Sequence, residues 1–137
     1  MAGQLTLDVA VPERRLIQEA VDEVQVPAAD GSMGILPGHA PLMTQLGIGV
    51  LSFKKDSRTR YIALHGGLME VLPDHVRILA DRAEWAEEVD IQRAMEVRQR
   101  MTDMLQRHDM EVDVEEAQDC IRSAQARLDA YDLAKLK

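Results

Sequence analysis

The hydrophobic pattern of this chain changes its period near Trp85, and that change constrains the fold more than any other feature. Before it, apolar and polar side chains alternate in short segments, as Leu5, Leu7 and Val9 do with their neighbours. This period of two is typical of strands that bury one face. After it, apolar side chains recur every three or four positions, the spacing of a helix with one apolar face. The sequence therefore predicts a β region followed by an α region.

The β region consists of short strand-like segments separated by turn signals. Residues 54–58 form a polar hairpin tip, and Pro73 and Asp74 mark another turn. Strands this short, with turns about every 8–12 residues and no helical stretch between them, favour an antiparallel β-sandwich or flattened barrel. We assign residues 1–86 to this domain. Its strand-like segments are residues 5–11, 16–26, 48–53, 60–64, 68–72 and 76–80.

The α region, residues 87–137, divides into two helices. Asp90 stands where an N-cap should begin the first helix, and His108 stands near its end. Asp113 and Glu116 give the second helix the form of a capping box. A break of about four residues between two helices predicts an antiparallel hairpin.

The two helices are expected to meet along small side chains. Such a seam lets the helices approach closely, but it buries little apolar area and is weak beside a leucine-rich one at ~25 cal/mol per Å². We therefore expect a hairpin that detaches easily. The small residues on the facing stripes are Ala94, Ala117 and Ala124.

The charge and composition exclude several classes of partner. The chain has 24 acidic and 16 basic residues, a formal net charge of −8, which disfavours binding to nucleic acid or to an anionic lipid surface. Cys120 is the only cysteine, so an internal disulfide is excluded and a reducing compartment is expected. No run reaches the ~18 apolar residues of a membrane span. We expect no direct membrane insertion, and any link to a membrane through a protein partner.

No residue pattern of a catalytic site is recognisable. The sequence has neither a Walker-type phosphate loop nor a G-x-S-x-G elbow. The four histidines show no metal-ligand spacing. We expect a protein without enzymatic activity, metal or obligatory cofactor. We also expect His39 to fix its loop by bonding a backbone carbonyl.

Residues 31–41 have the sequence GSMGILPGHAP, which combines turn residues with apolar ones. Three glycines and two prolines in this stretch exclude a helix or a central strand. Gly31, Gly34 and Gly38 suggest positive φ angles. Because Met33, Ile35 and Leu36 are apolar, we expect either a shaped loop that rests against another surface or a buried connection between two strands.

Residues 65–71, HGGLMEV, join two strand-like segments through a double glycine. Together with residues 31–41, and with the D-x-x-R-A string at residues 90–94, they give the chain its likeness to a known family. It resembles the epsilon subunit of the F-type, proton-translocating ATP synthase. That family pairs a loop of the form G-x-x-G-I-L-P-G-H-A-P with a G-G-x-x-E-V turn, and the resemblance runs along the whole chain.

The resemblance implies a non-catalytic subunit of the rotor, or central stalk. The sandwich would bind the gamma subunit and rest on the c-ring, passing proton-driven rotation to the catalytic sites. The expected position is peripheral, on the cytoplasmic face of a bacterial inner membrane, or on the thylakoid stromal or an equivalent organellar face. The expected gamma- and c-ring-facing loop residues are Gly31, Ser32, Met33, Gly34, Ile35, Pro37, Gly38 and His39.

The resemblance also implies that the hairpin inhibits ATP hydrolysis. In the family, the second helix can extend toward an acidic segment of the catalytic beta subunit. Arg122 and Arg127 are the residues that we expect to make that contact.

Some bacterial members bind ATP in the folded hairpin. The matching residues here are Asp90, Arg93, Ala94 and Arg127, with Arg93 suited to a phosphate. Two further family arginines are replaced by Glu116 and Ser123, and a glutamate would repel a phosphate. We expect ATP to be at most a weak regulatory ligand.

Without the resemblance, a second hypothesis stays open. The chain would then be a free-standing β-sandwich that binds other proteins and dimerises through its helical hairpin. The first hypothesis requires the gamma subunit as a partner, whereas the second requires self-association.

Overall fold

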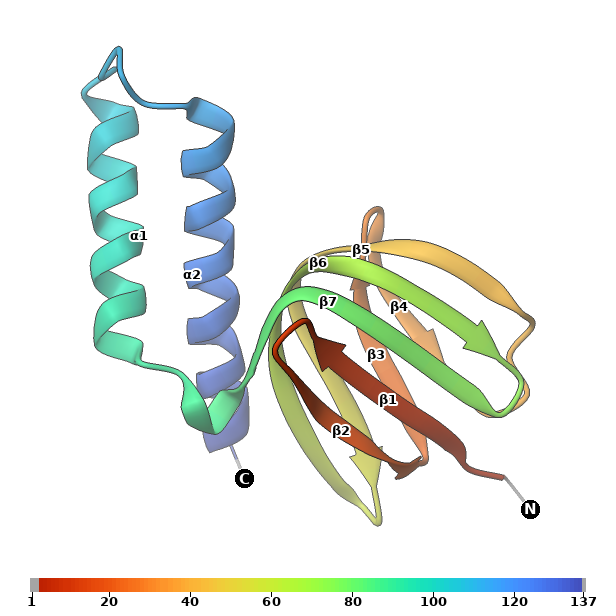
Figure 1. The fold of residues 1–137 in the computed structure, drawn as a ribbon. Coiled ribbons are helices and arrows are strands. Elements are labelled where there is room, and N and C mark those ends of the chain that lie inside the picture. The colour runs from red at the N-terminus through yellow and green to blue at the C-terminus, as the bar shows by residue number, and fades with distance from the viewer. Residues whose placement is uncertain (1–2, 137) are drawn as a thin grey trace.

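Seven strands form one sheet that wraps around a common interior, in the order β2-β1-β7-β6-β5-β3-β4 (Figure 1). The computed structural model describes residues 3–136, so the outermost residues of the two expected domains lie outside it. Neighbouring strands are antiparallel, except that β1 and β7 are parallel. The strands are β1 (Leu5–Val11), β2 (Arg14–Val21), β3 (Glu23–Ala28), β4 (Gly31–Ile35), β5 (Leu42–Lys55), β6 (Arg58–Leu72) and β7 (His75–Trp85).

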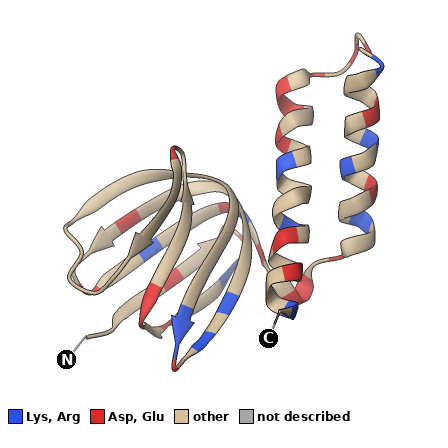
Figure 2. Cartoon of the chain, turned by 180° about the vertical axis from the view of Figure 1, so that it is seen from behind, with Lys and Arg blue, Asp and Glu red and all other residues tan. Residues whose placement is uncertain are grey.

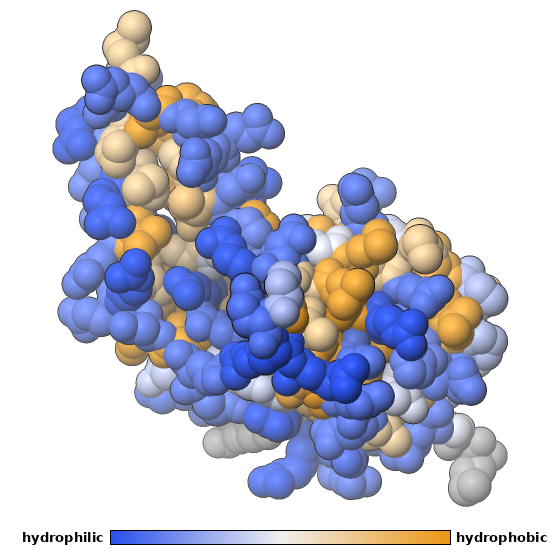
Figure 3. All heavy atoms as spheres, viewed as in Figure 1, coloured by the Kyte–Doolittle hydropathy of each residue, from blue (hydrophilic) through white to orange (hydrophobic). Residues whose placement is uncertain are grey.

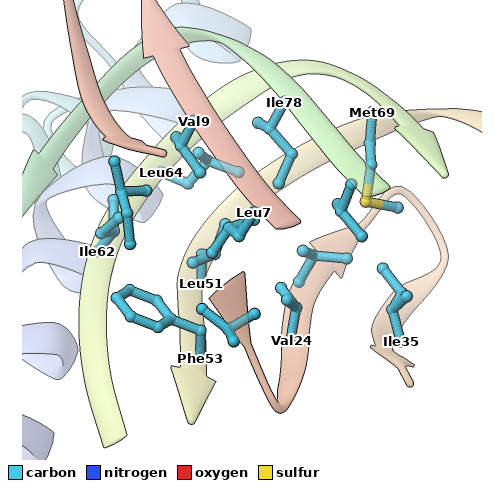
Figure 4. Close-up of a cluster of buried hydrophobic side chains, with 14 of the residues drawn as sticks. Leu7, Val9, Val24, Ile35, Leu51, Phe53, Ile62, Leu64, Met69 and Ile78 are labelled. Atoms are coloured by element: carbon cyan, nitrogen blue, oxygen red, sulfur yellow. The ribbon is translucent and has the colours of Figure 1, made fainter. Parts of the chain in front are cut away.

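The core of the sandwich is aliphatic, apart from one phenylalanine. Side chains from β1, β3, β5, β6 and β7 point into the same interior (Figure 4). The alternation that predicted β1 is confirmed, because Leu5, Leu7 and Val9 are buried. The largest fully buried side chains also include Val24, Ile35, Leu51, Ile62, Leu64, Met69 and Ile78. The predicted β-sandwich is therefore confirmed.

The segment at residues 16–26, predicted as one strand, is two. β2 ends at Val21 and β3 begins at Glu23, and Asp22 stands at the break. One carboxylate oxygen of Asp22 accepts a hydrogen bond of 3.1 Å from the backbone N–H of Asp56, in the β5–β6 hairpin tip. The backbone N–H of Asp22 donates to the carbonyl of Lys54 at 2.7 Å. These bonds to a distant hairpin hold the corner between the two strands.

The sequence suggested that the double glycine forms a turn between two strands. In the structure it is part of one long strand. β6 runs without interruption from Arg58 to Leu72 and keeps its register with β5 and β7 on both sides of the glycines. Gly66 and Gly67 have positive φ angles of 68° and 140°. Glycine thus permits a local distortion inside a paired strand.

The stretch at residues 31–41 is partly a strand, which differs from the predicted loop. Residues 31–35 form β4, an edge strand that pairs only with β3. An edge strand needs hydrogen bonds on one side alone, and so tolerates glycine better than a central one. Gly31 and Gly38 have positive φ angles of 129° and 85°, as expected, but the φ angle of Gly34 is not positive.

The α region begins with a single 3₁₀ turn, η1 (Ala86–Glu88), and continues as α1 (Ile91–Gln106) and α2 (Val114–Lys135). Both predicted N-caps are confirmed. The Asp90 side chain accepts from the Arg93 N–H, and the Asp113 side chain accepts from the Glu116 N–H, each at 3.1 Å. The two helices lie antiparallel (Figure 1). Their small residues Ala94, Ala117 and Ala124 are buried.

Of the two helices, α2 packs against the sandwich, and α1 lies on the side of α2 that is farther from it (Figure 1). The contact is made mainly by alanines: Ala130 of α2 packs with Ala63 of β6 and Ala86 of η1. Partly buried side chains around this cluster are Val50, Tyr61 and Ala134. Among residues 3–136, no helix is long and apolar enough to cross a membrane.

Candidate functional sites

The loop between β4 and β5 is fastened to the turn between β6 and β7. The backbone N–H of Gly38 donates to the carbonyl of Pro73 at 2.7 Å. His39 donates from Nδ1 to the carbonyl of Ala40 at 2.7 Å, the backbone bond that the sequence led us to expect. These bonds give the loop one shape at this end of the sandwich.

The residues expected to face gamma and the c-ring differ widely in exposure. Ile35 is fully buried in the core, and Met33 packs against it half-buried. Ile35 was expected to face gamma and the c-ring, but β4 directs its side chain into the core. Its neighbour Leu36 is 57% exposed. The remaining expected residues are exposed or half-buried: Gly31, Ser32, Gly34, Pro37, Gly38 and His39.

An apolar surface that the sequence did not reveal covers the outer face of β5, β6 and β7 near this loop. Leu68 lies directly opposite Leu79, and in the next row Met43 lies opposite Glu70, which in turn lies opposite Arg77. Figure 3 shows apolar side chains exposed over this side of the sandwich. We call the following residues of these strands the outer patch: Met43, Leu68, Leu72 and Leu79, which are 40–61% exposed.

The alternation of side chains within β6 is the sequence signal that could have predicted the outer patch. Along Leu68, Met69, Glu70, Val71 and Leu72, the inward side chains are Met69 and Val71, both fully buried. The outward positions are then Leu68, Glu70 and Leu72. A strand with one buried face should carry polar side chains on the other, so apolar residues at outward positions indicate a second, intermolecular contact.

Acidic residues at the end of β7 and in the connector to α1 form ion pairs with arginines. Arg14 binds both carboxylate oxygens of Glu88, at 2.6 and 3.1 Å, and these bonds hold the pKa of Glu88 below its usual range. Arg60 lies 3.2 Å from Glu87. Arg127 of α2 lies 2.5 Å from Glu84.

A cavity of about 260 Å³ lies where α2 meets the sandwich. The Arg82 guanidinium lies 3.1 Å from Nδ1 of His65. Burial, and then the charge of Arg82, hold the pKa of His65 below its usual value. The polar residues that line the cavity are Glu13, His65, Arg82, Glu84, Ser123 and Arg127.

The residues expected to hold ATP do not gather around this cavity. Arg127 lines it, but Asp90, Arg93 and Ala94 do not. The Asp90 carboxylate is used as the N-cap of α1, and Ala94 is fully buried in the helical seam. The Arg127 guanidinium is paired with Glu84.

The two arginines expected to contact beta differ in exposure and in partner. Arg122 is exposed and pairs with Asp119 of the same helix at 2.8 Å. Arg127 instead reaches β7. In this folded position the two arginines therefore have different surroundings.

Comparisons with known sequences agree over nearly the whole chain. The sequence model of the family described as "ATP synthase, Delta/Epsilon chain, beta-sandwich domain" matches residues 4–86. The ATP synthase epsilon chain of Solibacter usitatus is 51% identical over 132 residues, which cover 96% of this chain and 98% of the relative. The ATP synthase epsilon chain of Symbiobacterium thermophilum is 41% identical over 129 residues, 93% of each chain.

Solved structures show the same fold at lower identity. A chain of the Euglena gracilis mitochondrial ATP synthase has a TM-score of 0.71 at 19% identity, and the match covers 96% of this chain and 79% of that one. A chain from the central stalk and c-ring of the Tetrahymena thermophila mitochondrial ATP synthase has a TM-score of 0.62 at 13% identity, with 93% and 96% covered. The family match and the two close relatives decide the assignment. The chain belongs to the ATP synthase epsilon chain family.

Proposed function

We propose that this chain is a central-stalk subunit that transmits rotation of the c-ring, through the gamma subunit, to the catalytic sites of an F-type ATP synthase. Epsilon chains are non-catalytic subunits, so its contribution is mechanical and regulatory. As part of that membrane-associated complex, it would lie at the cytoplasmic face of a bacterial inner membrane, or at an equivalent face.

The observation that carries this proposal is the outer patch. Large apolar side chains that are exposed together mark a contact surface, because a monomer gains nothing by leaving them in water. The Glu70–Arg77 pair, 3.7 Å apart, lies among them and supplies polar contacts of the kind that surround an apolar interface. We assign the outer patch, with the adjoining loop at residues 36–41, to the contact with gamma and the c-ring.

The hairpin is proposed to act as a brake on ATP hydrolysis. α2 rests on the sandwich through a small alanine contact, and at ~25 cal/mol per Å² such a contact contributes little to stability. The free-energy gap between the folded position and a detached one is then small enough for a partner to reverse. In the detached position, α2 would reach the acidic segment of the beta subunit with Arg122.

Loss of gamma binding by an outer-patch variant tests this function. Leu68→Asp combined with Leu79→Asp places two charges in the middle of the patch, and we expect the gamma subunit no longer to copurify. Val114→Asp is the matched control, since Val114 is 55% exposed but lies at the start of α2. Circular dichroism and thermal melting check that each variant is folded. Undiminished gamma binding by the folded double variant would overturn the proposal.

A further inference from the structure

Three glutamates at the junction between sandwich and hairpin are each paired with an arginine from a different element. Glu84 lies at the end of β7, and Glu87 and Glu88 lie in η1. Their partners belong to α2, β6 and β2, respectively: Arg127, Arg60 and Arg14. Figure 2 shows the acidic η1 turn at the foot of the hairpin.

The three pairs do not join the same parts of the molecule. Arg14 and Arg60 are sandwich residues, so their bonds fasten η1 to the sandwich. Arg60 also lies over the ring of Trp85, 3.9 Å from its centroid, and so holds the start of the connector. Among the salt bridges of residues 3–136, Glu84–Arg127 is the one that joins the sandwich to a helix of the hairpin.

The pair between Glu84 and Arg127 matters because the apolar contact beside it is small. Ala63, Ala86 and Ala130 are the buried members of that contact, and alanine side chains bury little area. The side chains of Arg127 and Glu84 are only 37% and 23% exposed, so solvent screens this pair less than a surface pair.

We propose that Glu84–Arg127 is a latch that holds the hairpin in its folded position, while Arg14–Glu88 and Arg60–Glu87 are anchors that remain when the latch opens. The chain then bends at Val89 and Asp90, the two residues between η1 and α1, which have extended backbones. The latch rests on the hairpin movement of the proposed function, whereas its test uses the isolated chain.

The latch is tested by hydrogen exchange on the sandwich-facing amides of α2, around Ala126 and Ala130. Glu84→Arg and Arg127→Glu each replace attraction with repulsion, and we expect exchange there to quicken about fivefold or more. The double swap, Glu84→Arg with Arg127→Glu, restores the pair and should restore slow exchange. The matched control is Arg122→Glu, which removes a pair internal to α2 and should leave these amides unchanged.

The anchors are tested in the same samples by the fluorescence of Trp85, the only tryptophan. If the connector stays on the sandwich, the fluorescence emission of Trp85 is unchanged in all latch variants. Arg60→Gln should shift this emission, because it removes the cation over the Trp85 ring. A double swap that leaves exchange fast would overturn the latch, and a Trp85 shift in the single latch variants would overturn the anchors. Neither outcome depends on gamma binding, so the proposed function is judged separately.

Discussion

Gly67 of β6 lies directly opposite Ala80 of β7, and there is no room for a side chain between the two backbones. A Cβ atom on Gly67 would lie 2.7 Å from the Cα of Ala80, and the φ angle of Gly67 is 140°. An L-residue rarely adopts this angle. Glycine therefore allows β6 and β7 to approach closely at the distorted part of the strand, and the next residue, Leu68, belongs to the outer patch.

Gly67→Ala should therefore destabilise the sandwich by about 2–4 kcal/mol, through backbone strain and a clash with β7. Urea denaturation followed by circular dichroism measures the change. Gly3→Ala is the control, because nothing lies within 4 Å of a Cβ built there, and we expect it to stay within about 0.5 kcal/mol of the unsubstituted chain. Equal stability of the two variants would contradict this account of Gly67.

Local signals made much of this fold predictable from the sequence. The alternation in β1 and the N-caps Asp90 and Asp113 depend on residues close in sequence, so their pattern is visible without tertiary information. The double glycine was interpreted as a turn, but it is positive-φ backbone inside a strand. A turn and a distorted strand both require φ angles that glycine permits, and only the pairing partners distinguish them.

The features of the candidate sites that the sequence did not predict depend on pairing between residues far apart in the chain. Whether Ile35 or Leu36 faces the core is decided by the pairing of β4 with β3, and a shift of one residue would exchange them. The Glu84–Arg127 pair joins residues far apart in the sequence and was not predicted.

A shortened chain that ends at Glu88 should fold on its own. We propose that residues 1–86 are an independent domain, since the main apolar core lies entirely within β1–β7 and the hairpin adds only small side chains to it. Differential scanning calorimetry should show one cooperative transition for the shortened chain, a few degrees below that of the full chain. The absence of a transition, or aggregation at neutral pH, would mean that the hairpin is required for folding.

Nucleotide binding by the isolated chain should be weak or undetectable. Glu116 and Ser123 stand where the resembled site has arginines, and losing two phosphate partners at about 1.5–3 kcal/mol each removes much of any binding energy. Isothermal titration calorimetry with ATP should give no saturable binding at micromolar concentrations. A micromolar dissociation constant that disappears in Arg93→Ala would show that the site is functional.

Inhibition of ATP hydrolysis should depend on Arg122 more than on Arg127. They are five positions apart in the sequence, so they lie ~140° apart around α2 and cannot serve one narrow contact. Arg122 is exposed, whereas Arg127 is engaged by Glu84 in the folded position. Arg122→Ala should therefore weaken the contact with beta and raise hydrolysis by the assembled complex.

The size and salt dependence of this effect follow from the exposure of Arg122. An exposed ion pair contributes at most ~1 kcal/mol, so hydrolysis should rise about fivefold or less, and the difference should shrink as salt screens the pair. Arg127→Ala should not raise hydrolysis by as much, and by opening the latch it should favour the inhibited state. Hydrolysis rates measured at low and high salt for both variants test this. If neither substitution changes the rate at either salt concentration, inhibition does not depend on these arginines.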